Sequence, residues 1–335
     1  MDFRIESTRG DLVESMHRLS VAVVDHTGRL IASAGDPTLV SFWRSAAKPF
    51  QALPVVQDGA ADHWKFTPDE LALACASHSS ETIHLDVVDH MLRKIGCTEQ
   101  DMACGPHPPL GSDLTEAIPR VPTAMTPRWS NCSGKHAAML GLARHRGWST
   151  AGYEREDHPV QIRCLDEVAR WAGLPRETIR LAVDGCTAVC FGLPLQAMAT
   201  AYARLGANDE APARRIREAM MQHPMLVAGT GRLCTDLMAA FPGQVLAKVG
   251  ADGIYSAAWP SAGIGIALKV EDGDMRSARP ALLAVLRQLA EQGRISLQGD
   301  DWPAAVARHA ELPTLNTRGG VTGVLRAAGK LRYAA

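Results

Sequence analysis

Residues 44–50 read R-S-A-A-K-P-F, and this stretch says most about the fold and chemistry of the chain. Residues three apart share one face of a helical turn, so we expect the Ser45 hydroxyl beside the Lys48 amine. A serine becomes a good nucleophile when a base takes its proton, and a desolvated lysine can be that base. The S-x-x-K spacing therefore indicates a serine-dependent amidohydrolase, although alone it also fits a surface serine and a solvated lysine.

A second serine and a second lysine follow along the chain. Ser77 stands in C-A-S-H-S-S-E, where a helical pattern ends in a polar cluster, and Lys248 stands in A-K-V-G at the end of an apolar strand pattern. Penicillin-binding proteins and class A β-lactamases carry S-x-x-K, S-D-N and K-T-G in the same order. The match is partial, because S-H-S replaces S-D-N and K-V-G replaces K-T-G. The order of the three elements still favours catalysis.

Composition narrows the possible partners. The chain has 335 residues, of which 46% are apolar, and its net charge is 35 − 36 = −1. No basic run or basic-aromatic patch stands out, which argues against nucleic acid and against electrostatic docking to a membrane. The first six residues lack the apolar core of a signal peptide, and no apolar run could span a bilayer. We expect a cytoplasmic protein whose eight cysteines are mostly reduced.

Strand patterns stand at both ends of the chain and helical patterns lie between them. A hairpin is expected over 19–34, and further strands are expected over 244–249, 253–258, 263–270 and 320–325. Helices are expected over 48–57, 68–76, 83–95, 134–146, 159–172, 194–205, 211–222, 231–241 and 281–292. We predict one α+β domain over 1–335, with a mostly antiparallel sheet from about 10–40 and 244–335 and a helical part over about 45–243.

A cluster of possible metal ligands lies between the catalytic motifs. N-C-S-G-K-H at 131–136 marks a loop that turns into a helix, and D-G-C at 184–186 is a second polar break. Zinc prefers Cys, His, Asp and Glu, and a lysine ligand must first lose a proton. Ligand chemistry alone therefore favours Cys132, His136 and Cys186 as a site. Buried thiols beside a helix-capping loop are the simpler interpretation.

Taken together, these strings resemble the rhizobial-type L-asparaginases, often called asparaginase II. The strings that carry the resemblance are R-S-A-A-K-P at 44–49, C-A-S-H-S-S-E at 75–81, N-C-S-G-K-H at 131–136, D-G-C at 184–186 and K-V-G-A-D-G at 248–253. The resemblance implies a fold similar to serine β-lactamases and serine-type glutaminases. It also implies hydrolysis of L-asparagine to L-aspartate and ammonia, and it suggests a homodimer.

The resemblance also assigns roles to residues. It implies two Ser-Lys pairs, Ser45 with Lys48 and Ser77 with Lys248, at one active site. It implies a zinc ion held by Cys132, Lys135 and Cys186, in place of the set that ligand chemistry favours. We expect a positioning or structural role for this zinc. Substrate contacts are expected from Arg44, His136 and Asp184. The family leads us to expect glycine where this chain has Ser80.

Three questions stay open at the level of sequence. Either Ser45 or Ser77 could be the nucleophile of a two-step acyl transfer. The substrate could be glutamine or another amide, because one methylene is worth only about 1–3 kcal/mol in a pocket. A serine-dependent glutaminase or a β-lactamase-like amidohydrolase is thus the first alternative. A metal-stabilised binding protein for amino acids is the second, and it would form no covalent adduct with a serine-directed probe.

Overall fold

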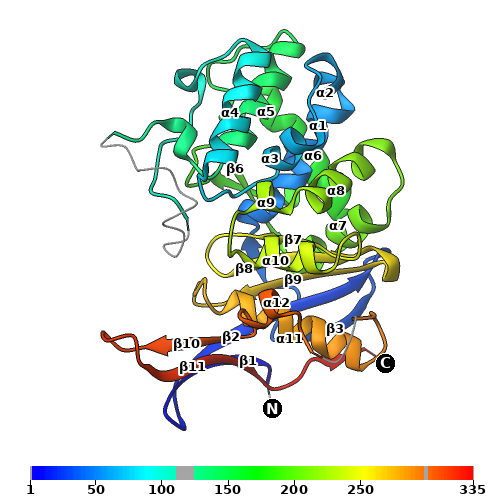
Figure 1. Ribbon diagram of the computed structural model, residues 1–335. Helices are drawn as coiled ribbons and strands as arrows, with labels where there is room; N and C mark the ends of the chain where they lie inside the picture. The colour runs from blue at the N-terminus through cyan, green and yellow to red at the C-terminus, as the bar shows by residue number, and fades with distance from the viewer. Residues whose placement is uncertain (1, 111–123, 298–300, 335) are drawn as a thin grey trace. The chain divides into compact units, whose positions relative to one another are not determined.

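The computed structural model describes residues 2–110, 124–297 and 301–334, and the chain divides into two compact units (Figure 1). The sheet unit comprises Met1–Ser41, Leu193–Ala207 and Ala247–Ala335. The helical unit comprises Phe42–Gly192 and Asn208–Leu246. Each unit is therefore assembled from segments that are distant in sequence.

The sheet unit is built on antiparallel strands in the order β10-β11-β1-β2-β9-β8-β7, with β3 paired to β2 and β12 paired to β3. The long strand β2 organises this sheet, because its first half pairs with β1 and its second half pairs with β9 and β3. The strands are β1 Arg4–Arg9, β2 Leu12–Asp25, β3 Leu30–Ala34, β7 Leu246–Val249, β8 Ile254–Trp259, β9 Ile264–Val270, β10 Glu311–Leu315, β11 Val321–Ala328 and β12 Arg332–Tyr333.

Two long helices bury the centre of this sheet. Helix α7 (Leu195–Ala207) packs on β9, β2 and β8, and helix α11 (Ala278–Glu291) also contacts β9 and β8. Almost every residue of these two strands is buried, as expected when both faces are covered. Gly265 allows α7 to approach closely, because a Cβ atom there would lie 2.0 Å from the Ala199 carbonyl oxygen. A short helix, α12 (Ala304–Ala307), completes the unit.

The helical unit carries most of the sequence motifs. Its helices are α1 Lys48–Gln57, α2 Ala60–His63, α3 Pro68–Ala74, α4 Thr82–Ile95, α5 Ser133–His145, α6 Pro159–Ala172, α8 Ala211–Gln222, α9 Pro224–Val227 and α10 Leu233–Ala240. A small sheet of order β4-β6-β5 joins β4 Val40–Phe42, β6 Val189–Pro194 and β5 Arg180–Val183. Helix α1 is buried along almost its whole length between α5, α6 and α8, so its first turn is held firmly.

The predicted α+β class is confirmed, as is the expected order of strands, helices and strands. One helix lies elsewhere than expected: α7 belongs to the sheet unit, because its small residues let it pack on β9. Strand β1 was missed, because its sequence R-I-E-S-T-R has little apolar alternation. All eight cysteines are free. No helix among the described residues is long and apolar enough to cross a membrane.

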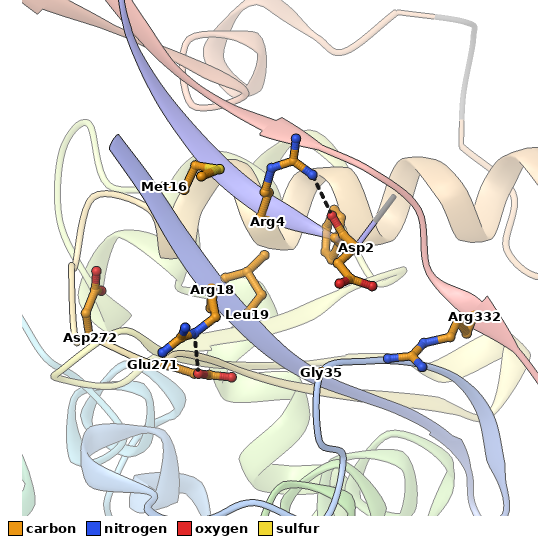
Figure 2. A pocket seen from close by; sticks show the side chains of 10 residues that line it. Asp2, Arg4, Met16, Arg18, Leu19, Gly35, Glu271, Asp272 and Arg332 are labelled. Atoms are coloured by element: carbon orange, nitrogen blue, oxygen red, sulfur yellow. Dashed lines mark hydrogen bonds and ion pairs between the residues drawn. The ribbon is translucent and has the colours of Figure 1, made fainter. Parts of the chain in front are cut away.

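A shallow cavity of about 710 Å³ opens in the sheet unit (Figure 2). Figure 2 shows the Arg18 guanidinium bonded to Glu271, and Arg4 bonded to the Asp2 carbonyl oxygen, around the side chains of Met16 and Leu19. The wall carries charge of both signs but none of the predicted catalytic residues. We therefore look for the active site in the segments that hold the motifs.

Candidate active site

Lys48 is the centre of the candidate site. Residues Arg44–Ala47 form a 3₁₀ turn that runs directly into α1, and Lys48 is the first residue of that helix. Its side chain is fully buried, and its Nζ atom lies 2.5 Å from the Ala76 carbonyl oxygen and 3.0 Å from Ser77 Oγ. The hydrogen bond that the structure shows from this amine to a serine therefore goes to Ser77. Ser45 is one turn away and is half-buried.

A strained turn holds Ser77 in place. Helix α3 ends at Ala74, and the backbone N–H of Ser77 then bonds to the Val227 carbonyl oxygen at 3.0 Å. Three residues later Ser80 has a φ of +56°, in the left-handed region that glycine adopts most easily. The Ser80 hydroxyl compensates by donating to the Trp129 carbonyl oxygen at 2.9 Å. The Ser80 hydroxyl therefore helps to hold a backbone conformation that glycine would adopt more easily.

Two buried histidines pack behind Ser77. The rings of His78 and His84 stack with centroids 5.1 Å apart, and each Nδ1 atom accepts a backbone N–H. The Nε2 atom of His78 therefore carries the proton, which points to Ser133 Oγ at 2.8 Å. Burial, reinforced by the neighbouring positive charges, lowers the pKa of His78 well below its ordinary value. Burial likewise lowers the pKa of His84. Both rings are held in the neutral form.

Asn131 links Lys48 to the cysteines, a role that the sequence did not reveal. Its Oδ1 atom lies 3.5 Å from Lys48 Nζ and 3.1 Å from the Cys132 sulfur. His107 fixes the orientation of this amide, because the His107 Nε2 atom accepts from both the backbone N–H and the side-chain amide of Asn131, at 2.8 and 2.7 Å. The Oδ1 atom is therefore directed toward the amine and the thiol.

The predicted zinc ligands lie together, and we call Cys132, Lys135 and Cys186 the thiolate cluster. The Lys135 Nζ atom lies 3.0 Å from the Cys186 sulfur, and all three side chains are buried. A hydrogen bond from Cys132, followed by the charge of Lys135, lowers the pKa of Cys186 far below its usual range. The hydrogen bond to Cys186 and burial raise the pKa of Cys132. These shifts favour the thiolate form of Cys186 and the thiol form of Cys132.

The charge on Lys135 survives burial. Burial alone would lower the pKa of this amine, but the opposing contributions, led by the charge of Cys186 and including Asp184, raise the pKa above its ordinary value. Glycine at position 134 makes the cluster possible, because helices α3 and α5 approach closely there. A Cβ atom on Gly134 would lie 2.4 Å from the Leu73 carbonyl oxygen.

His136 lies beside the cluster, between Tyr153 and Cys186. Its Nδ1 atom accepts a hydrogen bond from the Tyr153 hydroxyl at 2.5 Å, and that hydroxyl accepts the backbone N–H of Ala103. The buried His136 ring also interacts with Cys186 through a side-chain hydrogen bond. Burial lowers the pKa of this ring, and Cys186 opposes that shift. Ligand chemistry favoured His136 as a metal ligand, whereas the geometry gives it a hydrogen-bonded position at the edge of the cluster.

Of the other predicted residues, Arg44 and Asp184 meet each other. Arg44 Nε donates to Asp184 Oδ1 at 2.8 Å, and the same carboxylate oxygen accepts the backbone N–H of Gly185. This ion pair links the S-x-x-K turn to the D-G-C turn. Lys248 lies on β7 in the sheet unit, where its Nζ atom bonds to the Val249 carbonyl oxygen at 2.9 Å. The pairing of Lys248 with Ser77 stays a prediction.

A loop that carried no predicted role also reaches the Ser77 turn. Arg232 Nη1 lies 3.1 Å from Ser79 Oγ and 3.4 Å from the Ser77 carbonyl oxygen. The buried Glu81 carboxylate holds the loop by accepting both the backbone N–H and the hydroxyl of Thr230, at 2.7 and 2.8 Å. The sequence G-T-G-R at 229–232 could have indicated this loop, since two glycines around a threonine mark a tight turn.

Comparison with known proteins agrees with the motifs and their geometry. The model of a family described as L-asparaginase II matches residues 5–327. The chain belongs to the L-asparaginase II family. This is the family that the resemblance in the motifs predicted. No curated protein matches the sequence.

Solved structures give more distant matches. Mglu in its native form is 18% identical, with a TM-score of 0.46 over 85% of this chain and 66% of Mglu. Mglu in its L-glutamate binding form is 17% identical, with a TM-score of 0.43 over 85% of this chain and 63% of Mglu. A β-lactamase from Mycobacterium bovis is 15% identical, with a TM-score of 0.40 over 76% of this chain and 88% of the β-lactamase. This member of the L-asparaginase II family thus spans slightly under two thirds of the Mglu chains.

Proposed function

We propose that this protein hydrolyses the side-chain amide of L-asparagine to L-aspartate and ammonia through a serine acyl-enzyme. Membership of the family supports the substrate. The observation that carries the chemistry is the buried Lys48 amine, whose Nζ atom lies 3.0 Å from Ser77 Oγ. Lys48 itself lies one helical turn after Ser45. A serine hydroxyl and a lysine amine within hydrogen-bond reach form a nucleophile-and-base unit.

In this proposal Ser45 attacks the amide carbon and Lys48 accepts the Ser45 proton. Ser45 suits attack because it is half-buried, whereas Ser77 is only 4% exposed and already bonded to the amine. A neutral Lys48 keeps two N–H donors, which the Ala76 carbonyl and the Asn131 amide oxygen can accept. Its lone pair is then available to a hydroxyl. Backbone N–H groups of the S-x-x-K turn would stabilise the oxyanion.

Ser77 carries the proton onward in the same proposal. After attack, Lys48 returns its proton to the leaving ammonia through the Ser77 hydroxyl to which it is bonded. Lys48 and Ser77 then reverse these roles, so that a water molecule attacks the β-aspartyl ester and Ser45 is released. Lys248 is proposed to keep Ser77 oriented. Arg44, His136 and Asp184 are proposed to contact the substrate or to hold the residues that do.

We propose that the thiolate cluster binds zinc, because the side chains of Cys132, Lys135 and Cys186 lie together and are buried. The shift that lowers the pKa of Cys186 favours the thiolate form in which cysteine binds zinc. Across residues 2–110, 124–297 and 301–334, no three His, Cys, Asp or Glu side chains gather as a metal site. A zinc ion here would therefore need Lys135, deprotonated, as its third ligand. Bound zinc would supply positive charge and would link the N-terminal end of α5 to the D-G-C turn.

The decisive experiment measures ammonia release from L-asparagine and L-glutamine, with covalent labelling followed by intact-mass spectrometry. Wild type should release ammonia from L-asparagine, and Ser45→Ala should lose both turnover and the adduct. Ser77→Ala should lose turnover but still acquire the adduct, slowly. Ser149, exposed on a loop outside the site, provides a control in Ser149→Ala. An adduct on Ser77 in the Ser45 variant would instead identify Ser77 as the nucleophile.

Hydrolysis of L-glutamine is the second candidate function, because L-glutamine differs from L-asparagine by only one methylene that the substrate pocket would have to accept. If wild type prefers L-glutamine, the same residues serve and the substrate proposal is wrong. If no adduct forms and neither amide is hydrolysed, the protein is better described as an amino-acid-binding module.

A further inference from the structure

We infer that Arg232 binds the α-carboxylate of the amino-acid substrate. This assignment deepens the proposed function and rests on it, because it supposes an amino acid bound at Ser77. No sequence motif pointed to Arg232, and the position emerges from the contacts of the G-T-G-R loop.

Arg232 differs from the other half-buried arginines of the helical unit in having no acidic partner among the residues that the structure describes. Each of the others has a carboxylate oxygen within 3.8 Å of a guanidinium nitrogen; these are Arg44, Arg128, Arg163, Arg215 and Arg217. Among the described residues, Arg232 bonds only to the neutral oxygens of Ser77 and Ser79. Arginine stays charged in a protein, so this guanidinium is a cation whose counter-ion the described residues do not supply.

The side chain is also fixed before any ligand arrives. Gly229 and Gly231 have φ values of +121° and +71°, and a Cβ atom on Gly229 would lie 2.4 Å from Glu81 Oε1. The Thr235 hydroxyl donates to the Gly229 carbonyl at 2.7 Å, while Glu81 holds the backbone of Thr230. The loop has little freedom, which lowers the entropy that binding would cost.

The donors of the guanidinium suit a carboxylate. Nη1 donates to the Ser77 carbonyl and the Ser79 hydroxyl, which orients the guanidinium plane; within the described part of the chain, the N–H groups of Nε and Nη2 stay available to a ligand. Arginine binds carboxylates through two parallel N–H bonds. In asparagine, two carbon atoms separate the α-carboxylate carbon from the amide carbon. An anchor beside the Ser77 turn can therefore hold one end of the substrate while the other meets the catalytic serine.

Arg44 is less suited to this role. Its Nε atom donates to Asp184, so its charge is already compensated, and that bond joins two turns of the site. Binding a second carboxylate at Arg44 would either break this ion pair or place two carboxylates side by side. Arg232 requires neither change.

The test compares L-asparagine with β-alaninamide, which keeps the amine and the amide but lacks the α-carboxylate. The quantity measured is the ratio of kcat/KM for L-asparagine to kcat/KM for β-alaninamide. In Arg232→Gln this ratio should be lower than in wild type by a factor of about 10 to about 100, the range expected for hydrogen bonds to a charged group. Arg232→Lys should recover part of the ratio. Arg215→Gln, which removes a half-buried arginine paired with Asp62, should leave the ratio unchanged.

Equal losses for the two compounds would overturn the inference, because Arg232 would then only shape the Ser77 turn. Calorimetric binding of L-aspartate gives a readout that needs no turnover. If wild type hydrolyses neither amide, the proposed function fails, yet weaker binding of L-aspartate to Arg232→Gln than to Arg215→Gln still supports the carboxylate site. Equal binding to both variants, or no binding to wild type, overturns it.

Discussion

Replacing Gly134 by alanine tests whether the close approach of two helices sets the geometry of the site. Gly134 lies in the first turn of α5, beside the thiolate cluster, and a Cβ atom there would lie 2.4 Å from the Leu73 carbonyl oxygen and 2.7 Å from Leu73 Cγ. Ordinary contact needs about 3.5 Å, so α3 and α5 must separate by about 1 Å. Overpacking of this kind costs about 1–3 kcal/mol of folding free energy.

The same shift should reduce catalysis as well as stability. Helix α3 leads into the Ser77 turn and α5 carries Lys135, so a displacement of about 1 Å moves Ser77 relative to the cluster. Misplacement of that size can cost about 100-fold in rate. We therefore expect Gly134→Ala to lower the free energy of unfolding by about 1–3 kcal/mol and kcat by about 100-fold.

Gly141 in the same helix provides the control. A Cβ atom at Gly141 would meet only side-chain atoms, Ile95 Cγ2 at 3.2 Å and Phe66 Cζ at 3.3 Å, which can adjust. Alanine is also favoured over glycine in a helix by about 1 kcal/mol. Gly141→Ala should thus be close to neutral in urea unfolding and in ammonia release. If both variants unfold at the same urea concentration and keep wild-type kcat, the close approach at Gly134 does not matter and the reasoning fails.

Two further results are expected, one for pH and one for metal. The pKa values of His78 and His84 are held below the ordinary 6.5, so below about pH 6.5 these histidines bind protons in the unfolded chain but not in the folded chain. The free energy of unfolding should therefore fall between pH 6.5 and pH 5 by up to about 1.4 kcal/mol per pH unit for each histidine. Urea unfolding measures this, and a flat profile would contradict it. Elemental analysis should find zinc in wild type and in Cys164→Ser, which changes a buried cysteine on α6, but not in Cys186→Ser. Zinc at 100 times its Kd should stabilise wild type by about 2.7 kcal/mol in thermal unfolding. Equal zinc contents in the two variants would exclude the thiolate cluster as the site.

Much of the fold could be predicted because its elements carry local signals. The bounds of α1 and α6 match the expected ranges, since proline begins both helices and glycine or a turn ends them. The strands β1 and β10 were not foreseen, because neither contains a run of apolar residues. Strand β10 is an edge strand that buries little, whereas β1 lies between β11 and β2 and buries Ile5, Glu6 and Thr8.

The site was predictable where a residue type is chemically unusual, and not where its role depends on a partner. The cysteines and the S-x-x-K lysine can be recognised from the sequence alone, because their residue types have distinctive chemistry. Asn131 and His107 do not, because their contribution is an amide orientation that exists only once two loops meet. The sequence also suggested Ser45 as the hydrogen-bond partner of Lys48 from their spacing. In the structure the Nζ atom turns toward Ser77, because the buried Ala76 carbonyl and the Ser77 hydroxyl offer it acceptors.

Backbone conformation explains why these segments can hold a reactive site. Arg44 at the S-x-x-K turn, Ser80 after the Ser77 turn and Thr187 after the D-G-C turn all have positive φ values, of 55°, 56° and 74°. Such conformations cost about 1–3 kcal/mol each for residues with a side chain and persist only where surrounding contacts enforce them. Here the contacts are the Arg44–Asp184 ion pair, the bond from Ser80 Oγ to the Trp129 carbonyl, and the bond from Thr187 Oγ1 to the Ala103 carbonyl. Each strained turn is thus fastened to a segment distant in sequence, so that the turns bearing Ser45, Ser77 and Cys186 form only when the helical unit is folded.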